Sequence, residues 1–197
     1  EIFVIFQFKS KEAQPLIEKG QVMARQQFVL NPYQFPELRE NGKVDSEQFA
    51  TAIQKEETES YVKFDATGTT LTIGKRTGWI DYLDVDGEPM LVDRQSITPE
   101  FWRAPTDNDY GAGFQHRLGA WRNPQMKLKE CQVGDNGVVA RFEMPDVKAT
   151  LTMTYTLNTD GEVIVRQQLT ADKEAKVSQL PRYGMQLQMP KQFSEVT

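Results

Sequence analysis

The feature that most constrains the fold is a strict alternation of side chains between Ala149 and Leu157. Every odd-numbered residue in this range is apolar, and every even-numbered residue is threonine. Successive side chains of a β-strand point to opposite faces of the sheet, so a period of two places all the apolar side chains on one face. The range therefore predicts a β-strand with one buried face and one face in contact with water.

Shorter segments of similar character lie on both sides of this strand, within residues 61–65, 71–73, 141–144, 163–169 and 183–189. Four dipeptides that end in glycine are typical of the hairpin turns between strands: Thr77–Gly78, Asp86–Gly87, Asn136–Gly137 and Asp160–Gly161. The sequence has neither helical heptads nor an internal repeat of roughly 20–50 residues. These patterns predict an all-β fold with a large antiparallel sheet.

The first 58 residues follow a different pattern. Ile2–Phe8 is apolar at most even and odd positions alike, and Gln21–Leu30 is a second strand candidate. Two strands cannot close an immunoglobulin-like sandwich, which needs roughly seven. We therefore interpret residues 1–31 as the last hairpin of an immunoglobulin-like domain, residues 32–58 as a linker, and residues 59–197 as the N-terminal part of a second β-domain.

The charge balance argues against a nucleic-acid-binding protein. The 197 residues include 23 basic and 28 acidic side chains, for a formal net charge of −5 at pH 7, whereas nucleic-acid-binding domains concentrate positive charge. No apolar run reaches the roughly 20 residues that span a membrane. Cys131 is the only cysteine, so an internal disulfide is impossible and the compartment stays open between cytoplasm and periplasm.

The segment Phe101–Gly111 differs from the strands around it. Its sequence is Phe-Trp-Arg-Ala-Pro-Thr-Asp-Asn-Asp-Tyr-Gly, which is too polar for a core strand and too irregular for a helix. We expect an ordered loop entered from a strand, and we call this segment the signature loop. Polar groups that converge on an ordered loop are a common basis of binding and catalysis.

The signature loop resembles a tract in the C-terminal region (the small chain, or fifth domain) of β-galactosidases of glycoside hydrolase family 2. Three further segments are similar to the same enzymes in the expected order: Gly20–Phe28, Gly78–Leu91 and Leu180–Gly184. The resemblance implies a truncated, galactose-mutarotase-like antiparallel β-supersandwich, preceded by the last strands of an immunoglobulin-like β-sandwich. It also implies a parent enzyme that hydrolyses terminal β-D-galactosides with retention, of which this chain is a non-catalytic portion.

The resemblance places the catalytic groups outside this chain. Retaining glycosidases use two carboxyl groups roughly 5–5.5 Å apart, and in this family both are glutamates on a (β/α)₈ barrel, whose alternating pattern is absent here. We therefore expect no catalytic residue, metal ligand or cofactor in this chain, with Mg and Na bound on the barrel of the parent. The expected partners are the β-galactoside substrate, the remaining domains of the parent and further copies of it in a homo-oligomer, without nucleic acid or membrane.

The family does place a loop of this region near the mouth of the active site. In relatives, a mobile stretch begins at the glycine after the Asp-Asn-Asp triplet. The matching residues are Gly111 and Gly113, with Asp107, Asn108 and Asp109 as the anchored base of a substrate-proximal loop. Glycine suits a hinge because it tolerates unusual backbone angles, and loop closure can limit turnover.

Three residues are assigned as supports of this loop: Trp102, Arg103 and Arg182. Arg103 is expected to pair with an aspartate of the loop rather than to contact the sugar. For Trp102, core or interdomain packing is favoured over stacking on a sugar. For Arg182, a buried structural role is favoured over a position facing the substrate channel.

Alternative roles stay open for other residues. Trp121 is evenly balanced between sugar stacking and packing. The Asp-Asn-Asp triplet is less suited to acid–base catalysis or to calcium binding than to a capping network. His116, the only histidine, favours a surface position over a catalytic one. Cys131 has no helix or histidine beside it that would activate its thiol.

Two other functions are compatible with a β-sandwich. The first is a stand-alone carbohydrate-binding or structural module, against which the unpartnered apolar strand Ile2–Phe8 argues, because such an edge promotes aggregation. The second is an epimerase or mutarotase, which would need a histidine and a carboxylate as acid and base. The single histidine argues against that activity.

Overall fold

The structure is a computed structural model that describes residues 2–32, 52–93, 95–175 and 179–195. It divides into two compact units, Glu1–Leu38 and Arg39–Thr197, and each is described by itself. Most of the predicted linker, residues 33–51, lies outside the described residues. The predicted domain boundaries therefore stay predictions.

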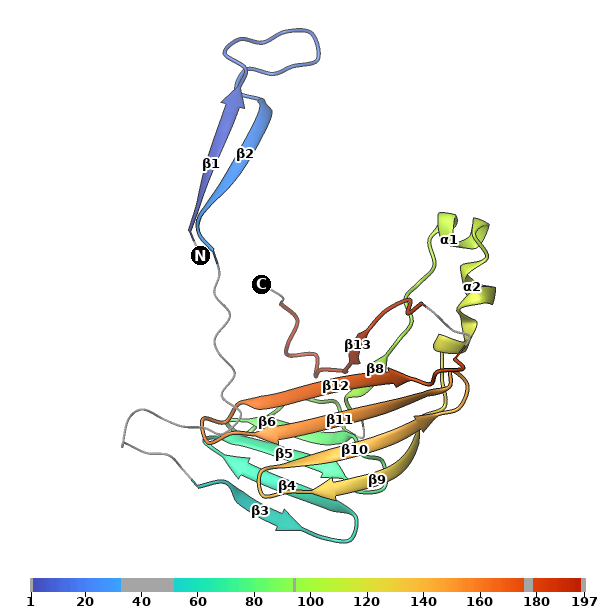
Figure 1. The fold of residues 1–197 in the computed structure, drawn as a ribbon. Helices are drawn as coiled ribbons and strands as arrows, with labels where there is room; N and C mark the ends of the chain where they lie inside the picture. Colours follow the sequence, from blue (N-terminus) through green and yellow to red (C-terminus); the bar gives the residue numbers. More distant parts are fainter. Residues whose placement is uncertain (1, 33–51, 94, 176–178, 196–197) are drawn as a thin grey trace. The chain divides into compact units, whose positions relative to one another are not determined.

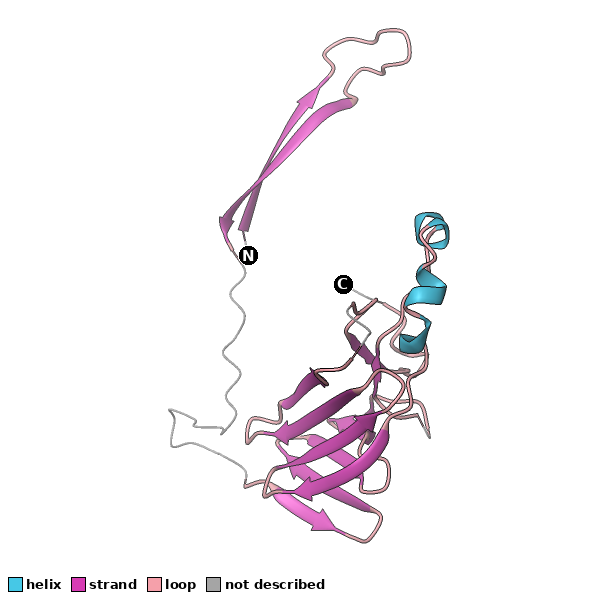
Figure 2. Cartoon of the chain, turned by 45° about the vertical axis from the view of Figure 1, so that its right-hand side comes forward, coloured by secondary structure: helices cyan, strands magenta, loops and turns pink. Residues whose placement is uncertain are grey.

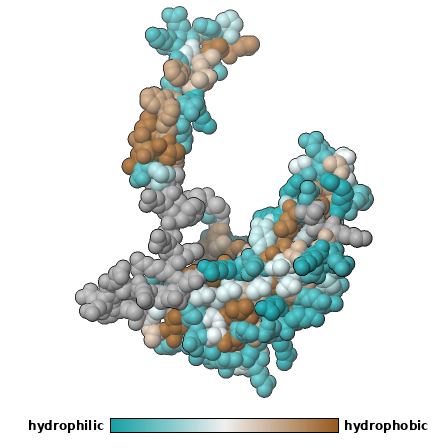
Figure 3. All heavy atoms as spheres, viewed as in Figure 1, coloured by the Kyte–Doolittle hydropathy of each residue, from teal (hydrophilic) through white to brown (hydrophobic). Residues whose placement is uncertain are grey.

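The first unit is an antiparallel hairpin of β1 (Ile2–Lys9) and β2 (Val22–Asn31), drawn in blue in Figure 1. Both strands expected here are confirmed. Apart from the half-buried Val4, their large apolar side chains are exposed, from 40% for Phe3 to 68% for Phe8, and Figure 3 shows apolar residues gathered along the hairpin. The assignment of this hairpin to an immunoglobulin-like domain stays a prediction.

The second unit contains two larger antiparallel sheets. The five-stranded sheet has the order β3-β4-β5-β6-β7. Its strands are Gln54–Glu57, Tyr61–Ala66, Thr69–Gly74, Ile80–Val85 and Glu88–Pro89. The four-stranded sheet has the order β12-β11-β10-β9. Its strands, in chain order from β9, are Lys127–Val133, Gly137–Met144, Ala149–Leu157 and Val163–Ala171.

The alternation that predicted the strand at residues 149–157 is confirmed. β11 buries every odd-numbered side chain, whereas all four of its threonines are partly exposed. Its register with β12 pairs Met153 with Gln167, and its register with β10 pairs Met153 with Ala140. β11 is thus an inner strand that contributes one whole face to the core.

The two sheets pack face to face around one hydrophobic core (Figure 1). Phe64 and Ile73 come from the five-stranded sheet, Phe142 and Leu151 come from the four-stranded sheet, and all four are at most 1% exposed. The predicted all-β sandwich is therefore confirmed, while the finer supersandwich assignment stays a prediction. No helix among the described residues is long and apolar enough to cross a membrane.

Glycine turns close hairpins at three of the four predicted dipeptides, those that contain Gly78, Gly87 and Gly161, whereas Gly137 is the first residue of β10. Asp86 and Gly87 both have positive φ, 52° and 82°, as a two-residue type I′ turn between β6 and β7 requires. Gly78 follows β5 with φ 73°. Beside it, Trp79 stacks on Phe142 with ring centroids 4.0 Å apart and planes 4° apart. The turn at Gly78 is therefore also part of the packing between the two sheets.

The structure corrects the sequence interpretation at two strands. β3 lies inside the predicted linker, and all four of its residues are exposed at the sheet edge. An edge strand that buries neither face has no apolar alternation, which is why its polar sequence resembled a linker. The strand expected over residues 183–189 is reduced to β13 (Gly184–Gln186), which pairs only with the short β8 (Thr98–Glu100).

Candidate functional site

The signature loop begins where β8 ends and leads into the helical segment at one end of the sandwich (Figure 2). Phe101 is 2% exposed and belongs to the core, which fixes the start of the loop. Its ring lies 5.4 Å from that of Trp121 and 6.0 Å from that of Tyr183. The loop therefore has a buried base rather than a free-standing one.

Part of the signature loop is helical, which corrects the expectation of an irregular loop. The helix α1 (Asp107–Gly111) is capped by Thr106. The Thr106 hydroxyl accepts a hydrogen bond from the Asp109 backbone N–H at 3.4 Å, and Asp109 Oδ2 accepts one from the Thr106 backbone N–H at 2.8 Å. This reciprocal pair is a capping box, and the Thr-x-x-Asp spacing was the sequence signal for it.

Asp109 also pairs with Arg103 through two bonds. Arg103 Nη1 lies 2.5 Å from Oδ2, and Nη2 lies 2.9 Å from Oδ1. The Asp109 side chain is 17% exposed, and the Arg103 guanidinium together with the Thr106 donors holds the pKa of this carboxyl well below its usual range. The expected arginine–aspartate pair is therefore present, and Asp109 is its acceptor.

The same guanidinium connects α1 to the next helix, α2 (Phe114–Arg117). Arg103 Cζ lies 4.6 Å from the centroid of the Phe114 ring, a cation–π distance. Trp102 packs on the same ring with centroids 5.0 Å apart. Phe114 is 5% exposed, so Arg103 joins the capped helix to a buried aromatic group. Sequence reasoning missed this role of Phe114.

The two glycines assigned as hinges differ in conformation. Gly113 has φ 67°, lies between α1 and α2, and has no atom within 4 Å of the position that a Cβ would take. Gly111 is the last residue of α1 and lacks a positive φ. Asp107 and Asn108 are exposed on α1. Only Gly113 therefore has the left-handed backbone that favours glycine.

A groove lies beside the base of the signature loop, along the pairing of β8 with β13. The register places Glu100 opposite Gly184 and Thr98 opposite Gln186. The groove has a volume of about 510 Å³ and is lined by Glu100, Trp102, Arg103, Arg182, Gln186 and Leu187, among others. We call it the β8–β13 groove. It brings together all three residues that the sequence assigned as supports of the loop.

Arg182 is exposed and lines this groove, so the favoured buried role was wrong. The residue follows Pro181 in a stretch with no apolar periodicity, and the pairing of β13 with β8 carries it to the surface beside the loop. Trp102 is partly buried on Phe114 and also lines the groove. Packing and contact with a ligand are thus both available to its indole ring.

The remaining candidates have simpler positions. Trp121 is 3% exposed and packs in the core. Of its two open roles, sugar stacking and packing, the structure therefore favours packing. His116 is exposed on α2, as expected. Burial raises the pKa of the Cys131 thiol, so this cysteine is not activated as a nucleophile.

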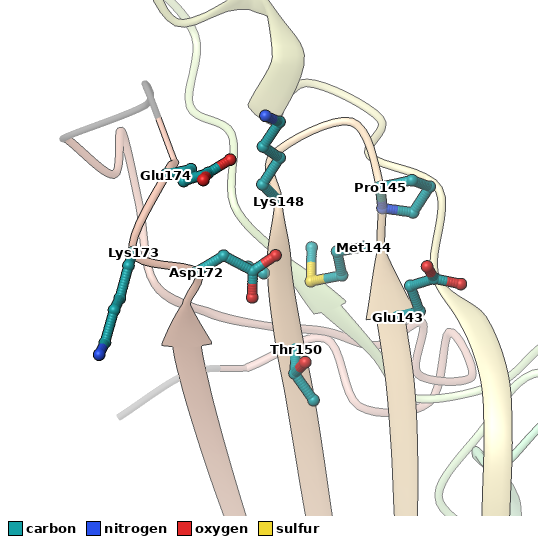
Figure 4. Close-up of a pocket in the computed structure, with 9 residues that line it drawn as sticks. Glu143, Met144, Pro145, Lys148, Thr150, Asp172, Lys173 and Glu174 are labelled. Carbon is teal, nitrogen blue, oxygen red and sulfur yellow. The ribbon is translucent and has the colours of Figure 1, made fainter.

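A second cavity, of about 500 Å³, lies at the end of β10 and β11 (Figure 4). Glu143, Lys148 and Asp172 contribute charged side chains to it, and Lys173 points away from the others. None of the residues assigned from the sequence lines this cavity. Within the described residues, no group of three histidine, cysteine, aspartate or glutamate side chains could hold a metal ion.

The fold is an all-β sandwich domain. At one end of it, the signature loop contains the capped helix α1 and is held by the ion pair between Arg103 and Asp109. The family model described as the β-galactosidase small chain matches residues 65–197, and the chain belongs to this family. The match includes the signature loop, both strands of the β8–β13 groove and the four-stranded sheet.

Curated relatives are consistent with this family. A β-galactosidase of Lactobacillus delbrueckii subsp. bulgaricus is 32% identical over 132 residues, which cover 64% of this chain and 13% of the relative. A β-galactosidase of Priestia megaterium is 26% identical over 152 residues, covering 74% and 14%. A β-galactosidase of Staphylococcus xylosus is 27% identical over 114 residues, covering 54% and 11%. The chain therefore spans only a small part of the length of these relatives.

Proposed function

We propose that this chain is a non-catalytic C-terminal portion of a β-galactosidase that hydrolyses terminal β-D-galactosides with retention. The observation that carries the proposal is the small-chain family match over residues 65–197. In the same proposal, the signature loop contributes to the rim of the active site, and the galactoside is held and cleaved by the rest of the parent enzyme.

The electrostatics of the loop support a non-catalytic role. A general acid of a glycosidase needs a raised pKa, so that it stays protonated until it protonates the leaving group. Asp109 is the loop carboxyl with the closest cation, and its pKa is lowered by Arg103. It is therefore ionised and occupied as a hydrogen-bond acceptor, which suits a structural anchor and not an acid.

The backbone supports the rim role. Thr106, Arg103 and Asp109 hold α1 by side-chain bonds at its first turn, whereas Gly113 supplies an unusual backbone conformation after its end. A fixed first turn followed by a glycine joint is the arrangement that a loop needs if its tip is to move while its base stays in place. The exposed apolar residues of the β1–β2 hairpin also favour a chain that works within a larger protein.

Immunodepletion of a source-cell lysate tests the proposal. Antibody to this chain is used to deplete the lysate, and hydrolysis of a chromogenic β-galactoside is measured before and after depletion, with non-immune antibody as the control. We expect the activity to leave the lysate with this chain, and to migrate on a native gel in a band much larger than the 22.6 kDa of the chain. Activity that stays in the fully depleted lysate would contradict the proposal.

A further inference from the structure

The connection between β9 and β10 contains the dipeptide Asn136–Gly137, which has no part in the signature loop or in the proposed function. Asparagine is a thermolabile residue, because the backbone nitrogen of the next residue can attack its side-chain amide carbon. A glycine in that next position shields its nitrogen least, since it has no Cβ. The dipeptide is therefore a candidate for chemical modification, and its surroundings decide whether the reaction can proceed.

The packing of the two strands requires glycine at position 137. The register pairs Gly137 with Thr156 of β11. A Cβ on Gly137 would overlap the backbone oxygen of Tyr155 and would lie 3.1 Å from Thr156 Cα. Any other residue would force the strands apart, so the fold keeps a glycine directly after Asn136.

The backbone nitrogen of Gly137 is not engaged across the turn. The Gly137 carbonyl accepts a hydrogen bond from the Gly134 backbone N–H at 2.8 Å. The return bond, from the Gly137 N–H to the Gly134 carbonyl, is not formed between these two described residues. The nitrogen that would attack Asn136 is thus not held by the acceptor nearest to it in the hairpin.

The side chain of Asn136 is held weakly and lies beside water-accessible space. Its Nδ2 donates to the Leu157 backbone oxygen at 3.3 Å, beyond the usual range of about 2.7–3.2 Å. A cavity of about 280 Å³ is lined by Asn136, Gly137 and Tyr155, among others. A water molecule occupies roughly 30 Å³ in the liquid, so the cavity has room for the water and the base that the reaction needs.

We propose that Asn136 is a site of spontaneous deamidation. The Gly137 nitrogen loses its proton to a solvent base and bonds to Asn136 Cγ, while the bond from Cγ to Nδ2 breaks and the nitrogen leaves as ammonia. Water then opens the cyclic imide at either carbonyl carbon, which yields aspartate or, where the original backbone bond breaks, isoaspartate. The net reaction consumes water and releases ammonia, without an oxidant or a reductant.

Both products weaken the end of the β10–β11 pairing. The Leu157 N–H donates to the Asn136 carbonyl at 2.9 Å, and Leu157 is fully buried. Aspartate replaces the donor beside the Leu157 oxygen by a carboxylate, which cannot donate when ionised. Isoaspartate adds a methylene group to the backbone and displaces the carbonyl that holds the Leu157 N–H. The reaction therefore limits the lifetime of the folded sandwich.

Mass spectrometry of the aged 197-residue chain tests the proposal. The chain is incubated at mildly alkaline pH, and tryptic peptides are analysed at intervals. We expect progressive loss of unmodified Asn136 from the peptide of residues 130–141, with aspartate and isoaspartate as products. The other Asn–Gly dipeptide, Asn41–Gly42, lies in a separate tryptic peptide. Asn136 that stays unmodified would overturn the proposal.

Two asparagines of the same chain are internal controls. Asn108 is exposed on α1, but the N–H that follows it, of Asp109, is engaged in the capping box. Asn158 is 1% exposed, and hydrogen bonds hold its side-chain amide. Both should stay unmodified while Asn136 reacts. Loss at Asn108 as fast as at Asn136 would mean that exposure alone decides, and it would overturn the role assigned to Gly137.

The variant Asn136→Gln tests the structural consequence. Glutamine keeps an amide at this position, but it would have to close a larger imide ring, which forms more slowly. The urea midpoint, followed by tryptophan fluorescence, should fall on ageing of the wild type and stay constant on ageing of Asn136→Gln. Equal losses in the two proteins would overturn the link between this site and stability. Neither measurement uses a galactoside, so the outcome is independent of the proposed function.

Discussion

Replacement of Gly78 by alanine should destabilise the sandwich strongly. Gly78 has φ 73°, and an L-residue in the left-handed region costs about 1–2 kcal/mol. An added Cβ would also lie 2.7 Å from Phe142 Cζ and 2.9 Å from Leu128 Cδ1. Phe142 is 1% exposed and stacked on Trp79, so its ring cannot move without disturbing the packing between the sheets.

Gly87 offers a matched control for this substitution. It has φ 82° and no atom within 4 Å of the position of a Cβ, so Gly87→Ala introduces the backbone strain alone. Overpacking of a core costs about 1–3 kcal/mol. The gain from a less flexible unfolded chain, about 0.4–1 kcal/mol, is common to both variants. The free energy of unfolding should therefore fall by about 1–3 kcal/mol more for Gly78→Ala than for Gly87→Ala.

Urea unfolding followed by tryptophan fluorescence measures this difference. All three tryptophans, Trp79, Trp102 and Trp121, lie in the second unit, so the signal reports the sandwich and not the β1–β2 hairpin. Equal unfolding free energies for the two variants, within about 0.5 kcal/mol, would refute the claim that the Gly78 turn is packed against Phe142.

Asp109→Asn should lower the Tm of the sandwich at neutral pH by weakening the pairing with Arg103. Because the folded-state pKa of Asp109 is lowered from 3.8, its stabilisation is present above that value and is lost as pH falls through the folded pKa, so the Tm gap to wild type should close between about pH 5 and pH 1. A gap that is independent of pH would contradict this linkage. In the intact parent enzyme, Gly113→Ala should reduce kcat because of its positive φ, whereas Gly111→Ala should have little effect. Steady-state kinetics with both variants checks this, and equal kcat values would remove Gly113 as the joint.

Most of the secondary structure could be predicted from local sequence patterns. A period of two is a property of neighbouring residues, so β11 and the glycine turns could be predicted without knowledge of their partners. The capping box of α1 was equally local, and the Thr106–Asp109 spacing could have predicted it. β3 could not be predicted in this way, because a strand exposed on both faces is distinguished only by its hydrogen bonds to β4.

The candidate site depended on pairings between distant segments. Sequence reasoning named both aspartates of the signature loop as partners of Arg103, but only the capped helix aims Asp109 at the guanidinium. It likewise treated Trp121 as evenly balanced, and burial beside Phe101 decided the outcome. Neither result follows from the order of residues, because both depend on where a turn of helix directs a side chain.

The sequence by itself determined that the chain is β-rich, where most strands and turns lie, and which segment resembles β-galactosidases. Only the tertiary structure decided that Arg182 is exposed and that it lines one groove together with Trp102 and Glu100. The physical reason is that β8 and β13 lie more than 80 residues apart in the chain, and hydrogen bonds between them bring the two segments together. Alternation of side chains predicts the face on which a residue lies, but it contains no information about which distant strand lies beside it.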